Sequence, residues 1–371
     1  MKYDLIAVGK AFDLRADFVS AEPYGSGHVN DTYVARYRQA GAPVRYIHQR
    51  INHNIFKDPP ALMDNIARVT EHQRRKLLAL NDGDMTRRCL TLVPTVEGSP
   101  FHVDADGNTW RTHLFIEKAQ TYDEIRSTRQ AYEAAKAFGE FQKQLKDLPG
   151  GPLHETIPAF HDTRARFEAL RRALDADPEN RAAGVKAEIA FAMDREEMTG
   201  VLRNLQAAGR IPTVVTHNDT KLNNVMLDDE TGDAVCVIDL DTVMPGLSLY
   251  DFGDMARTAT RPTPEDETNL DAVEARLDMF EALARGYLAS VGDELNDVEL
   301  AHLAFSARLI TFEIGIRFLT DYLQGDAYFK THRPGHNLDR CRVQFKMVRS
   351  LEAKAETMEK IVAAARPALY P

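Results

Sequence analysis

Two short apolar segments that flank a polar loop constrain the fold of this chain more than any other feature. They occupy residues 213–216 and 234–238 and have the length and β-branched content of buried strands. The loop between them begins with H-N-D-T-K-L-N-N at residues 217–224, and Asp239 follows the second segment. Polar side chains next to strand ends often carry a protein's chemistry. We therefore expect this strand-loop-strand segment to hold the functional residues.

The loop fits the pattern H-x-D-x-x-x-x-N, and Asp239 comes 20 positions after Asp219 (239 − 219). Phosphoryl transfer explains each part of this pattern. An acidic side chain, here Asp219, would orient the attacking hydroxyl and accept its proton. Asn224 and Asp239 would bind Mg²⁺, because this ion prefers hard oxygen ligands. An ordinary polar hairpin loop is the alternative, and the two flanking strands make it the weaker interpretation.

A second motif lies near the start of the chain, where Gly25-Ser26-Gly27 precedes a predicted strand at residues 32–37. Glycines let backbone N–H groups approach phosphate oxygens, although glycine pairs also form plain hairpins. The motif lacks the G-K-[ST] ending of a Walker loop, which argues against a P-loop enzyme. We take Gly25 and Gly27 as nucleotide contacts. Gln49 occupies the third-strand position where most kinases have a lysine.

The distribution of predicted elements indicates an α+β fold with two lobes. With 371 residues the chain exceeds one usual core. Residues 1–116 read mainly as short strands around one helix, which predicts a small strand-rich N-terminal lobe that binds nucleotide. Residues 117–371 read mainly as helices, which predicts a larger C-terminal lobe that carries the catalytic loop and, by the resemblance described below, the acceptor site. The longest predicted helices cover 265–290, 297–323 and 339–365.

Composition excludes several classes of protein. A net charge of −10 and a pI near 5.7 argue against a nucleic-acid partner. Three scattered cysteines are too few for a disulfide framework. No apolar run approaches the roughly 18 residues of a membrane span, and Asp4 lies where a signal peptide would be apolar. We therefore expect a cytoplasmic protein with no membrane partner.

Two further motifs invite other interpretations. Asp251-Phe252-Gly253 spells a protein-kinase magnesium triplet but follows a proline-glycine loop, so we predict that Asp251 braces the catalytic loop. Residues 239–243 read D-L-D-T-V and resemble the nucleophile motif of haloacid-dehalogenase-type phosphatases. Such phosphatases need a further acidic pair after several strand-helix units, whereas mostly helix follows here. The phosphatase stays open as a weaker alternative.

Together these motifs resemble the aminoglycoside-phosphotransferase superfamily, which includes choline, homoserine and methylthioribose kinases. Within it, the chain is similar to the N-acetylhexosamine 1-kinase family nearly end to end, from Glu22 to about Ala355. The similar segments are residues 22–30, 216–224, 238–246, 250–254 and 317–329.

The resemblance implies a protein-kinase-like bilobal fold, ATP and Mg²⁺ as cofactors, and transfer to the anomeric C1 hydroxyl of an N-acetylhexosamine. It also implies that His28, Arg317 and Tyr328 line the sugar site, and that Gln49 belongs to the nucleotide site. Thr258 departs from the family, which has an aromatic residue there. Another acceptor (an amino alcohol, homoserine or a different sugar) or a pseudokinase remains an alternative to the sugar kinase.

Overall fold

The computed structural model describes residues 2–25, 29–80 and 84–366. Its chain forms two compact units, each assembled from separate stretches of sequence. Unit 1 consists of Met1–Thr121, Gln144–Pro158 and Val225–Pro245, and unit 2 consists of Tyr122–Lys143, Ala159–Asn224 and Gly246–Pro371. Unit 1 thus takes up two segments that lie beyond residue 116. The assignment of nucleotide binding to residues 1–116 and of acceptor binding to residues 117–371 stays a prediction.

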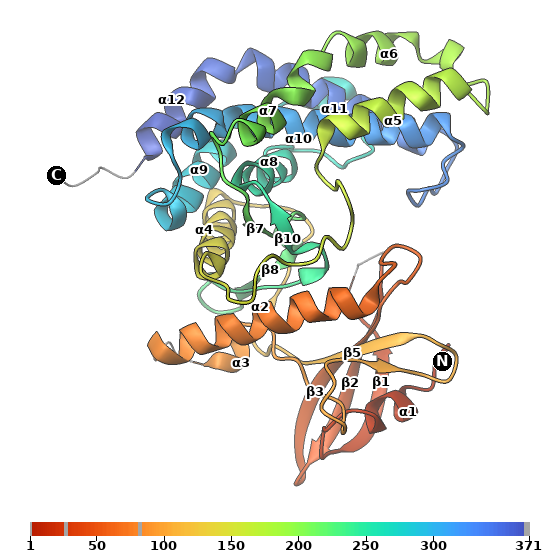
Figure 1. Ribbon diagram of the computed structural model, residues 1–371, viewed down its shortest axis with the longest axis vertical. Coiled ribbons are helices and arrows are strands. Elements are labelled where there is room, and N and C mark those ends of the chain that lie inside the picture. Colours follow the sequence, from red (N-terminus) through yellow and green to blue (C-terminus); the bar gives the residue numbers. More distant parts are fainter. Residues whose placement is uncertain (1, 26–28, 81–83, 367–371) are drawn as a thin grey trace, which may run out of the picture. The chain divides into compact units, whose positions relative to one another are not determined.

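A five-stranded antiparallel sheet forms the centre of unit 1 (Figure 1). Its strand order is β1-β2-β3-β5-β4, with bounds Asp17–Pro23 (β1), Asp31–Gln39 (β2), Ala42–Arg50 (β3), His102–Val103 (β4) and Thr109–Leu114 (β5). β2 and β3 fall where alternating apolar residues predicted strands.

One face of this sheet packs against α1 (Leu5–Lys10). Tyr33 and Tyr37 of β2 and Trp110 of β5 are buried there in one apolar cluster with Leu5. Successive side chains of a strand point to opposite faces. The neighbours of these aromatic residues along each strand therefore lie on the other face of the sheet, away from α1.

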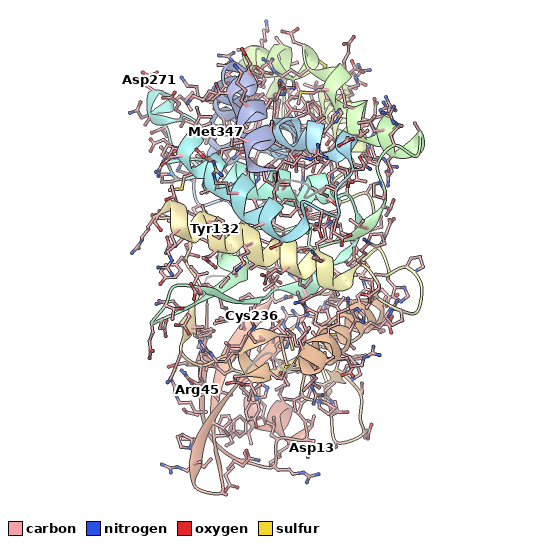
Figure 2. All side chains as sticks on the ribbon, turned by 90° about the vertical axis from the view of Figure 1, so that its left-hand side faces the viewer. Asp13, Arg45, Tyr132, Cys236, Asp271 and Met347 are labelled. Atoms are coloured by element: carbon pink, nitrogen blue, oxygen red, sulfur yellow. The ribbon has the colours of Figure 1, made fainter. Side chains whose placement is uncertain are left out.

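The remaining elements of unit 1 are two helices and a second sheet. The helices are α2 (Pro59–Leu80) and α3 (Met85–Arg88), and the sheet has the order β6-β8-β9, with bounds Ala119–Gln120 (β6), Val225–Asp228 (β8) and Ala234–Val237 (β9). Cys236 lies buried in β9 (Figure 2). The short helix η4 (Leu240–Thr242) follows this strand, so Asp239 lies at the junction of the two elements.

Unit 2 is mainly helical. Its principal elements are α4 (Thr128–Leu145), α5 (Thr163–Ala176), η1 (Ala182–Gly184), α6 (Lys186–Met193), η2 (Glu196–Gly200), α7 (Val201–Ala207), β7 (Val214–Thr216), η3 (Leu222–Asn224), α8 (Ser248–Ala259), η5 (Leu270–Ala272), α9 (Leu277–Val291), α10 (Asp297–Leu323), α11 (His336–Ala353) and α12 (Ala355–Ala365). Two elements cross the unit boundaries in sequence: α4 ends in unit 1, and β10 (Met244–Gly246) begins there.

The helix α10 covers the predicted residues 297–323. It begins at a capping box, in which the Asn296 side chain and Glu299 satisfy each other's backbone N–H groups. α5 and α11 pack against α10 and bury Phe167, Phe312 and Phe345 in one apolar cluster. This packing explains why α10 tolerates 27 residues with apolar side chains on several faces.

Two of the predicted helices differ from the structure. The helix expected over 265–290 begins only at Leu277, and residues 265–276 instead form turns and the short helix η5. The helix expected over 339–365 is interrupted at Lys354, where α11 ends and α12 begins. The predicted α+β class, with a strand-rich N-terminal sheet and a larger helical C-terminal part, is confirmed. No helix in the part of the chain that the structure covers is both long and apolar enough to cross a membrane.

Candidate active site

The loop after β7 brings Asp219 and Asn224 together. The Asn224 amide nitrogen donates to the Asp219 backbone oxygen at 2.7 Å and to its carboxylate Oδ2 at 3.1 Å. The Asp219 side chain is about one quarter exposed, with a relative exposure of 24%. A base must reach its substrate, so this partial exposure suits the predicted role. Because the Asn224 nitrogen makes both contacts, its amide oxygen is the atom that a cation would bind.

Lys221 lies beside the carboxylate of Asp219, with its ammonium 2.7 Å from Oδ1. Burial alone would raise the pKa of Asp219, but the charge and hydrogen bond of Lys221 outweigh it. His217 and Arg257 act in the same direction as Lys221, and the pKa of Asp219 falls below its usual value. The carboxylate is therefore ionised at neutral pH, as a group that orients a hydroxyl must be.

Asp251 holds the start of this loop from α8. Its carboxylate accepts hydrogen bonds from the backbone nitrogens of His217 at 2.9 Å and Asn218 at 2.7 Å. The Thr220 hydroxyl donates to the Asp251 backbone oxygen at 2.7 Å. Burial raises the pKa of Asp251 to about 7, against the two backbone donors that lower it. The prediction that Asp251 braces the catalytic loop is confirmed.

A buried histidine supports the same loop from the opposite side of Asn218. His161 Nε2 lies 2.8 Å from the Asn218 backbone oxygen, and Nδ1 lies 2.8 Å from Glu313 Oε1. Both partners can only accept, so both ring nitrogens must donate, and the ring is an imidazolium. Burial lowers the pKa of His161, but the Glu313 carboxylate outweighs it and the pKa is raised.

His161 holds Asn218 in a left-handed conformation, with a φ of 65°. Neither His161 nor Glu313 was predicted from the sequence. They lie far from the loop along the chain, and no motif includes them. The one available sequence signal was an acidic residue, Glu313, within a long and mainly apolar predicted helix, because such a charge needs a partner if it is buried.

Arg317 and Tyr328, two of the predicted sugar contacts, also lie together in unit 2. The Arg317 guanidinium is 6.0 Å from the Tyr328 ring centroid and 5.4 Å from that of Phe160. Tyr328 is 62% exposed, which is unusual for a large aromatic side chain. The Asp321 carboxylate fixes the segment by accepting from the Tyr328 backbone nitrogen at 2.7 Å. The third predicted contact, His28, lies outside the described residues.

The predicted nucleotide contacts belong to unit 1. Gly25 has a φ of 81°, in the left-handed region, and no atom recorded for the described residues lies within 4 Å of an added Cβ. Gly27 lies outside the described residues. Gln49 of β3 donates from Nε2 to the Thr32 hydroxyl at 2.9 Å. Its Oε1 accepts from Arg111 Nε at 2.8 Å and from Nη2 at 2.6 Å.

Arg111 also forms a buried ion pair with Asp241, which sequence reasoning did not predict. The second oxygen of Asp241 accepts from the Asn30 amide at 2.6 Å. In the phosphatase alternative Asp241 would be a second catalytic carboxylate. It is instead 3% exposed and bound to Arg111, so this contact disfavours the phosphatase. Asp239 itself is exposed and has a φ of 58°.

Among residues 2–25, 29–80 and 84–366, no group of three or more His, Cys, Asp or Glu is placed to hold a metal ion. Mg²⁺ in kinases keeps several waters and takes one or two protein ligands besides the phosphates. An exposed carboxylate at Asp239 and the amide oxygen of Asn224 are donors of the kind that Mg²⁺ accepts. Each of the two residues is thus by itself a suitable ligand for Mg²⁺, and its role stays a prediction.

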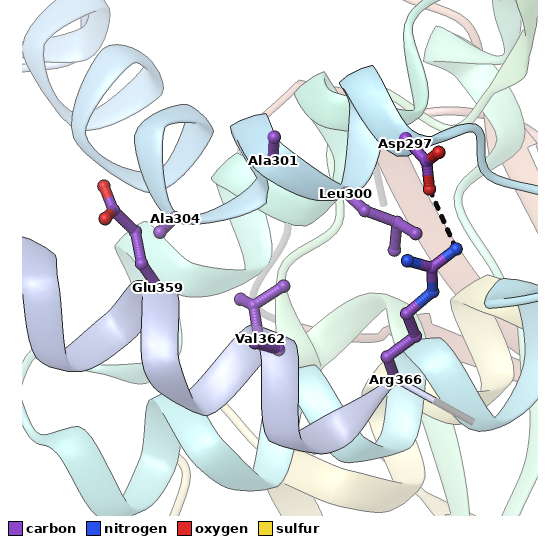
Figure 3. A pocket seen from close by; sticks show the side chains of 8 residues that line it. Asp297, Leu300, Ala301, Ala304, Glu359, Val362 and Arg366 are labelled. Atoms are coloured by element: carbon purple, nitrogen blue, oxygen red, sulfur yellow. Dashed lines mark hydrogen bonds and ion pairs between the residues drawn. The ribbon is translucent and has the colours of Figure 1, made fainter. Parts of the chain in front are cut away.

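A pocket of about 480 Å³ lies elsewhere in unit 2, between α10 and α12 (Figure 3). Leu300 and Val362 form its apolar part, and an ion pair of 2.8 Å between Asp297 and Arg366 lies at one end. None of the predicted site residues lines this pocket. Its position therefore gives no information on the proposed chemistry.

Comparisons with known proteins bear on the family and the fold of this chain. The model of the phosphotransferase enzyme family matches residues 20–288. A microcompartment-associated aminopropanol kinase is similar with a TM-score of 0.59 and 17% identity, over 95% of this chain and 98% of that one. An aminoglycoside phosphotransferase from Alicyclobacillus acidocaldarius is similar with a TM-score of 0.57 and 12% identity, over 97% of this chain and 95% of that one. Plasmodium vivax ethanolamine kinase is similar with a TM-score of 0.50 and 14% identity, over 86% of this chain and 80% of that one. At these identities the likeness concerns the fold, and the predicted kinase-like fold is confirmed.

Proposed function

Because the chain belongs to the phosphotransferase enzyme family and is thus a small-molecule kinase, we propose that it phosphorylates the anomeric C1 hydroxyl of an N-acetylhexosamine. ATP would be the phosphate donor, and the product would be the sugar 1-phosphate. The observation that carries this proposal is the pairing of Arg317 with the exposed ring of Tyr328, in the same unit as Asp219. An aromatic face and a planar cation suit a sugar ring that carries hydroxyl and amide oxygens.

The charge around Arg317 also bears on the acceptor. Two of the similar structures are kinases of amino alcohols, whose acceptors are cations at neutral pH. A cationic acceptor beside Tyr328 would meet Arg317 and, near it, Arg166, whose pKa is lowered by burial and by the charge of Arg317. Glu313 and Asp162 offset part of the positive charge at Arg166. Like charges at close range are unfavourable, whereas an uncharged sugar meets no such repulsion from either arginine. The site therefore favours a neutral acceptor over an amino alcohol.

In the proposed reaction Asp219 positions the C1 hydroxyl and takes its proton as the oxygen attacks the γ-phosphorus. The bond between that phosphorus and the bridging oxygen of ADP breaks as the new P–O bond forms. Lys221 keeps Asp219 ionised before the transfer. Asp251 and His161 hold the peptide groups just before Asp219, so the base has a fixed position.

Mg²⁺, when bound with ATP, would neutralise the charge on the β- and γ-phosphates. Asp239 and Asn224 are the residues we assign to hold it. Gly25, Gly27 and Gln49 are assigned to the nucleotide, and His28 joins Arg317 and Tyr328 on the sugar. These roles rest on the motifs and on the local contacts described above.

An acceptor panel tests the proposal. ADP release would be measured with ATP and Mg²⁺ in the presence of N-acetylglucosamine, N-acetylgalactosamine, glucose, ethanolamine, aminopropanol, choline and homoserine. We expect the N-acetylated sugars to give the highest kcat/KM. An amino alcohol as the best acceptor would refute the sugar assignment and leave the kinase assignment intact. ADP release that no acceptor stimulates would argue for a phosphatase, and no ADP release with any acceptor would argue for a pseudokinase.

A further inference from the structure

The five-stranded sheet of unit 1 contains no lysine in its described strands. Protein kinases place a lysine on the third strand to hold the nucleotide phosphates, and an acidic residue pairs with that lysine. Here the corresponding position of β3 holds Gln49, which carries no charge. A positive charge for the phosphates must therefore come from another residue, if this lobe works as other kinase lobes do.

Arg111 has the required position. It lies on β5 directly opposite Gln49 in the strand register, and Thr32 of β2 lies opposite Gln49 on the other side. Trp110, the neighbour of Arg111, belongs to the cluster beneath α1, so Arg111 lies on the other face of the sheet. Gln49 shares that face, since Tyr46, three residues earlier on β3, belongs to the α1 cluster.

The other arginines of the sheet do not fit. Arg38 of β2 is exposed and donates to the Gly41 backbone oxygen at 3.2 Å. Arg50 lies on the α1 side by the same alternation and pairs with Asp31 at 2.7 Å. Arg36 is on the same face as Arg111 but is exposed and pairs with Glu22 at 2.7 Å. Arg45 is bound to Glu117 at the far end of β3.

Arg111 fixes how Gln49 is oriented. A guanidinium can only donate, so the two contacts from Arg111 place the oxygen of the Gln49 amide toward it and the nitrogen away. One N–H of that nitrogen is used by the Thr32 hydroxyl. Among the described residues no other side chain or backbone oxygen is recorded as accepting from this nitrogen, so its second N–H can donate to a ligand. The charge of Arg111 on the amide oxygen strengthens it as a donor.

Asp241 supplies the acidic partner. One carboxylate oxygen pairs with Arg111, and the other accepts from Asn30, which lies at the end of the glycine-containing segment. Asn30 in turn accepts from the Asn52 backbone nitrogen at 2.9 Å. Asp241 lies two residues after Asp239. Asp241 thus links Arg111 of β5 to Asn30, and it lies in the same segment as the predicted metal ligand Asp239.

We propose that Arg111 replaces the strand lysine of kinase-like folds: it supplies the positive charge for the nucleotide phosphates, Gln49 makes the direct contact, and Asp241 is the acidic partner. The cation that kinases place on the third strand thus comes from β5 in this protein. Arg111 is a positioning residue, because it is buried at 2% exposure and acts through Gln49. The inference rests on the proposed use of ATP and does not depend on which acceptor is phosphorylated.

Moving the charge back to β3 tests the proposal. The variants are Arg111→Gln, Gln49→Lys, the double variant Gln49→Lys/Arg111→Gln, and Gln49→Met. ADP binding would be measured by titration calorimetry with excess Mg²⁺ and no acceptor, and folding would be checked by urea unfolding. Arg36→Gln is the control, because it removes an exposed arginine from the same face of the sheet.

Arg111→Gln should weaken ADP binding by at least about tenfold, the loss typical of one charge-assisted contact. Gln49→Lys should also weaken it, because it places a second cation beside a buried arginine. The double variant should bind within about threefold of wild type, since it restores one cation and its pairing with Asp241. Gln49→Met, at a partly exposed position, should fold and bind at least about tenfold more weakly.

Wild-type ADP affinity in folded Arg111→Gln or in Gln49→Met would overturn the proposal. So would a folded double variant that binds no better than the weaker of its single variants. If Arg111→Gln does not fold, the ADP affinity of Gln49→Met tests the proposal instead, with the same expected loss of at least about tenfold. The ADP titrations contain no acceptor, so a result that refutes the role of Arg111 does not affect the sugar assignment. Conversely, an acceptor panel that identifies a different acceptor does not affect the role proposed for Arg111.

Discussion

His161→Gln tests whether the buried imidazolium positions the catalytic loop. The wild-type ring donates to Glu313 and to the Asn218 backbone oxygen, both at 2.8 Å. The side chains of both ionic partners are almost fully buried, at 2% and 0% exposure, so solvent screens the pair little. Glutamine carries no charge and reaches only one of the two acceptors.

The expected cost follows from these contacts. Removing one partner of a buried ion pair costs about 3–5 kcal/mol, because the other charge stays buried without compensation. Glutamine replaces one hydrogen bond, and Thr163 still donates to Glu313 at 2.6 Å. We therefore expect a loss of about 2–4 kcal/mol in the free energy of unfolding. The kcat should fall by about 10- to 100-fold as Asp219 loses its fixed position.

The effect should depend on pH with a defined sign. The pKa of His161 is raised in the folded state by Glu313 and, more weakly, by Asp254 on α8. A raised histidine pKa contributes stability that is fully present below the unfolded value of about 6.5 and is lost as pH rises through the folded value. The difference between wild type and His161→Gln should therefore be largest near pH 6 and smaller near pH 9.

Urea unfolding at both pH values, with kcat measured alongside, provides the assay. His302→Gln on α10 is the control and should change stability by less than about 0.5 kcal/mol. Glu313→Gln should reduce the pH dependence, because it removes the charge that raises the pKa of His161. The account is refuted if His161→Gln matches wild type in stability and kcat, or if Glu313→Gln keeps the full pH dependence.

Four further variants address the proposed catalytic and metal-binding residues. Asp219→Asn should fold normally and lose about 10²- to 10⁴-fold in kcat, because an amide cannot accept the hydroxyl proton; a kcat within a few-fold of wild type would remove Asp219 from this role. Asn224→Ala should raise the Mg²⁺ concentration needed for half-maximal activity, and Asp239→Ala should abolish activity; unchanged Mg²⁺ titrations would contradict both assignments. Lys221→Met should raise the pKa of Asp219 and move the acidic limb of the kcat/KM profile to higher pH, and an unmoved limb would show that Lys221 does not set this pKa.

The sequence predicted the elements whose signals are local. The strands around the Asp219 loop and the long helix α10 follow from apolar periodicity, and the brace at Asp251 follows from motif spacing. The prediction of one continuous helix over 339–365 was wrong, because the apolar pattern continues through Lys354 while the backbone hydrogen bonding changes there.

The contacts that sequence reasoning missed are long-range pairs of buried charges. Arg111 and Asp241 are 130 positions apart, and His161 and Glu313 are 152 positions apart. Nothing in the pattern around either member indicates its partner, since a single arginine or glutamate in an amphipathic segment usually faces solvent. Only the packed strands and helices show that these side chains are buried and must therefore be paired.

The structure of the product tests the central claim most directly. The enzyme would be incubated with ATP, Mg²⁺ and N-acetylglucosamine, and the product examined by phosphorus NMR and by a reducing-sugar assay. Phosphorylation at C1 predicts a phosphorus signal coupled to the anomeric proton and loss of one reducing end for each ADP released. A phosphorylated sugar that still reduces, such as a 6-phosphate, would contradict the account.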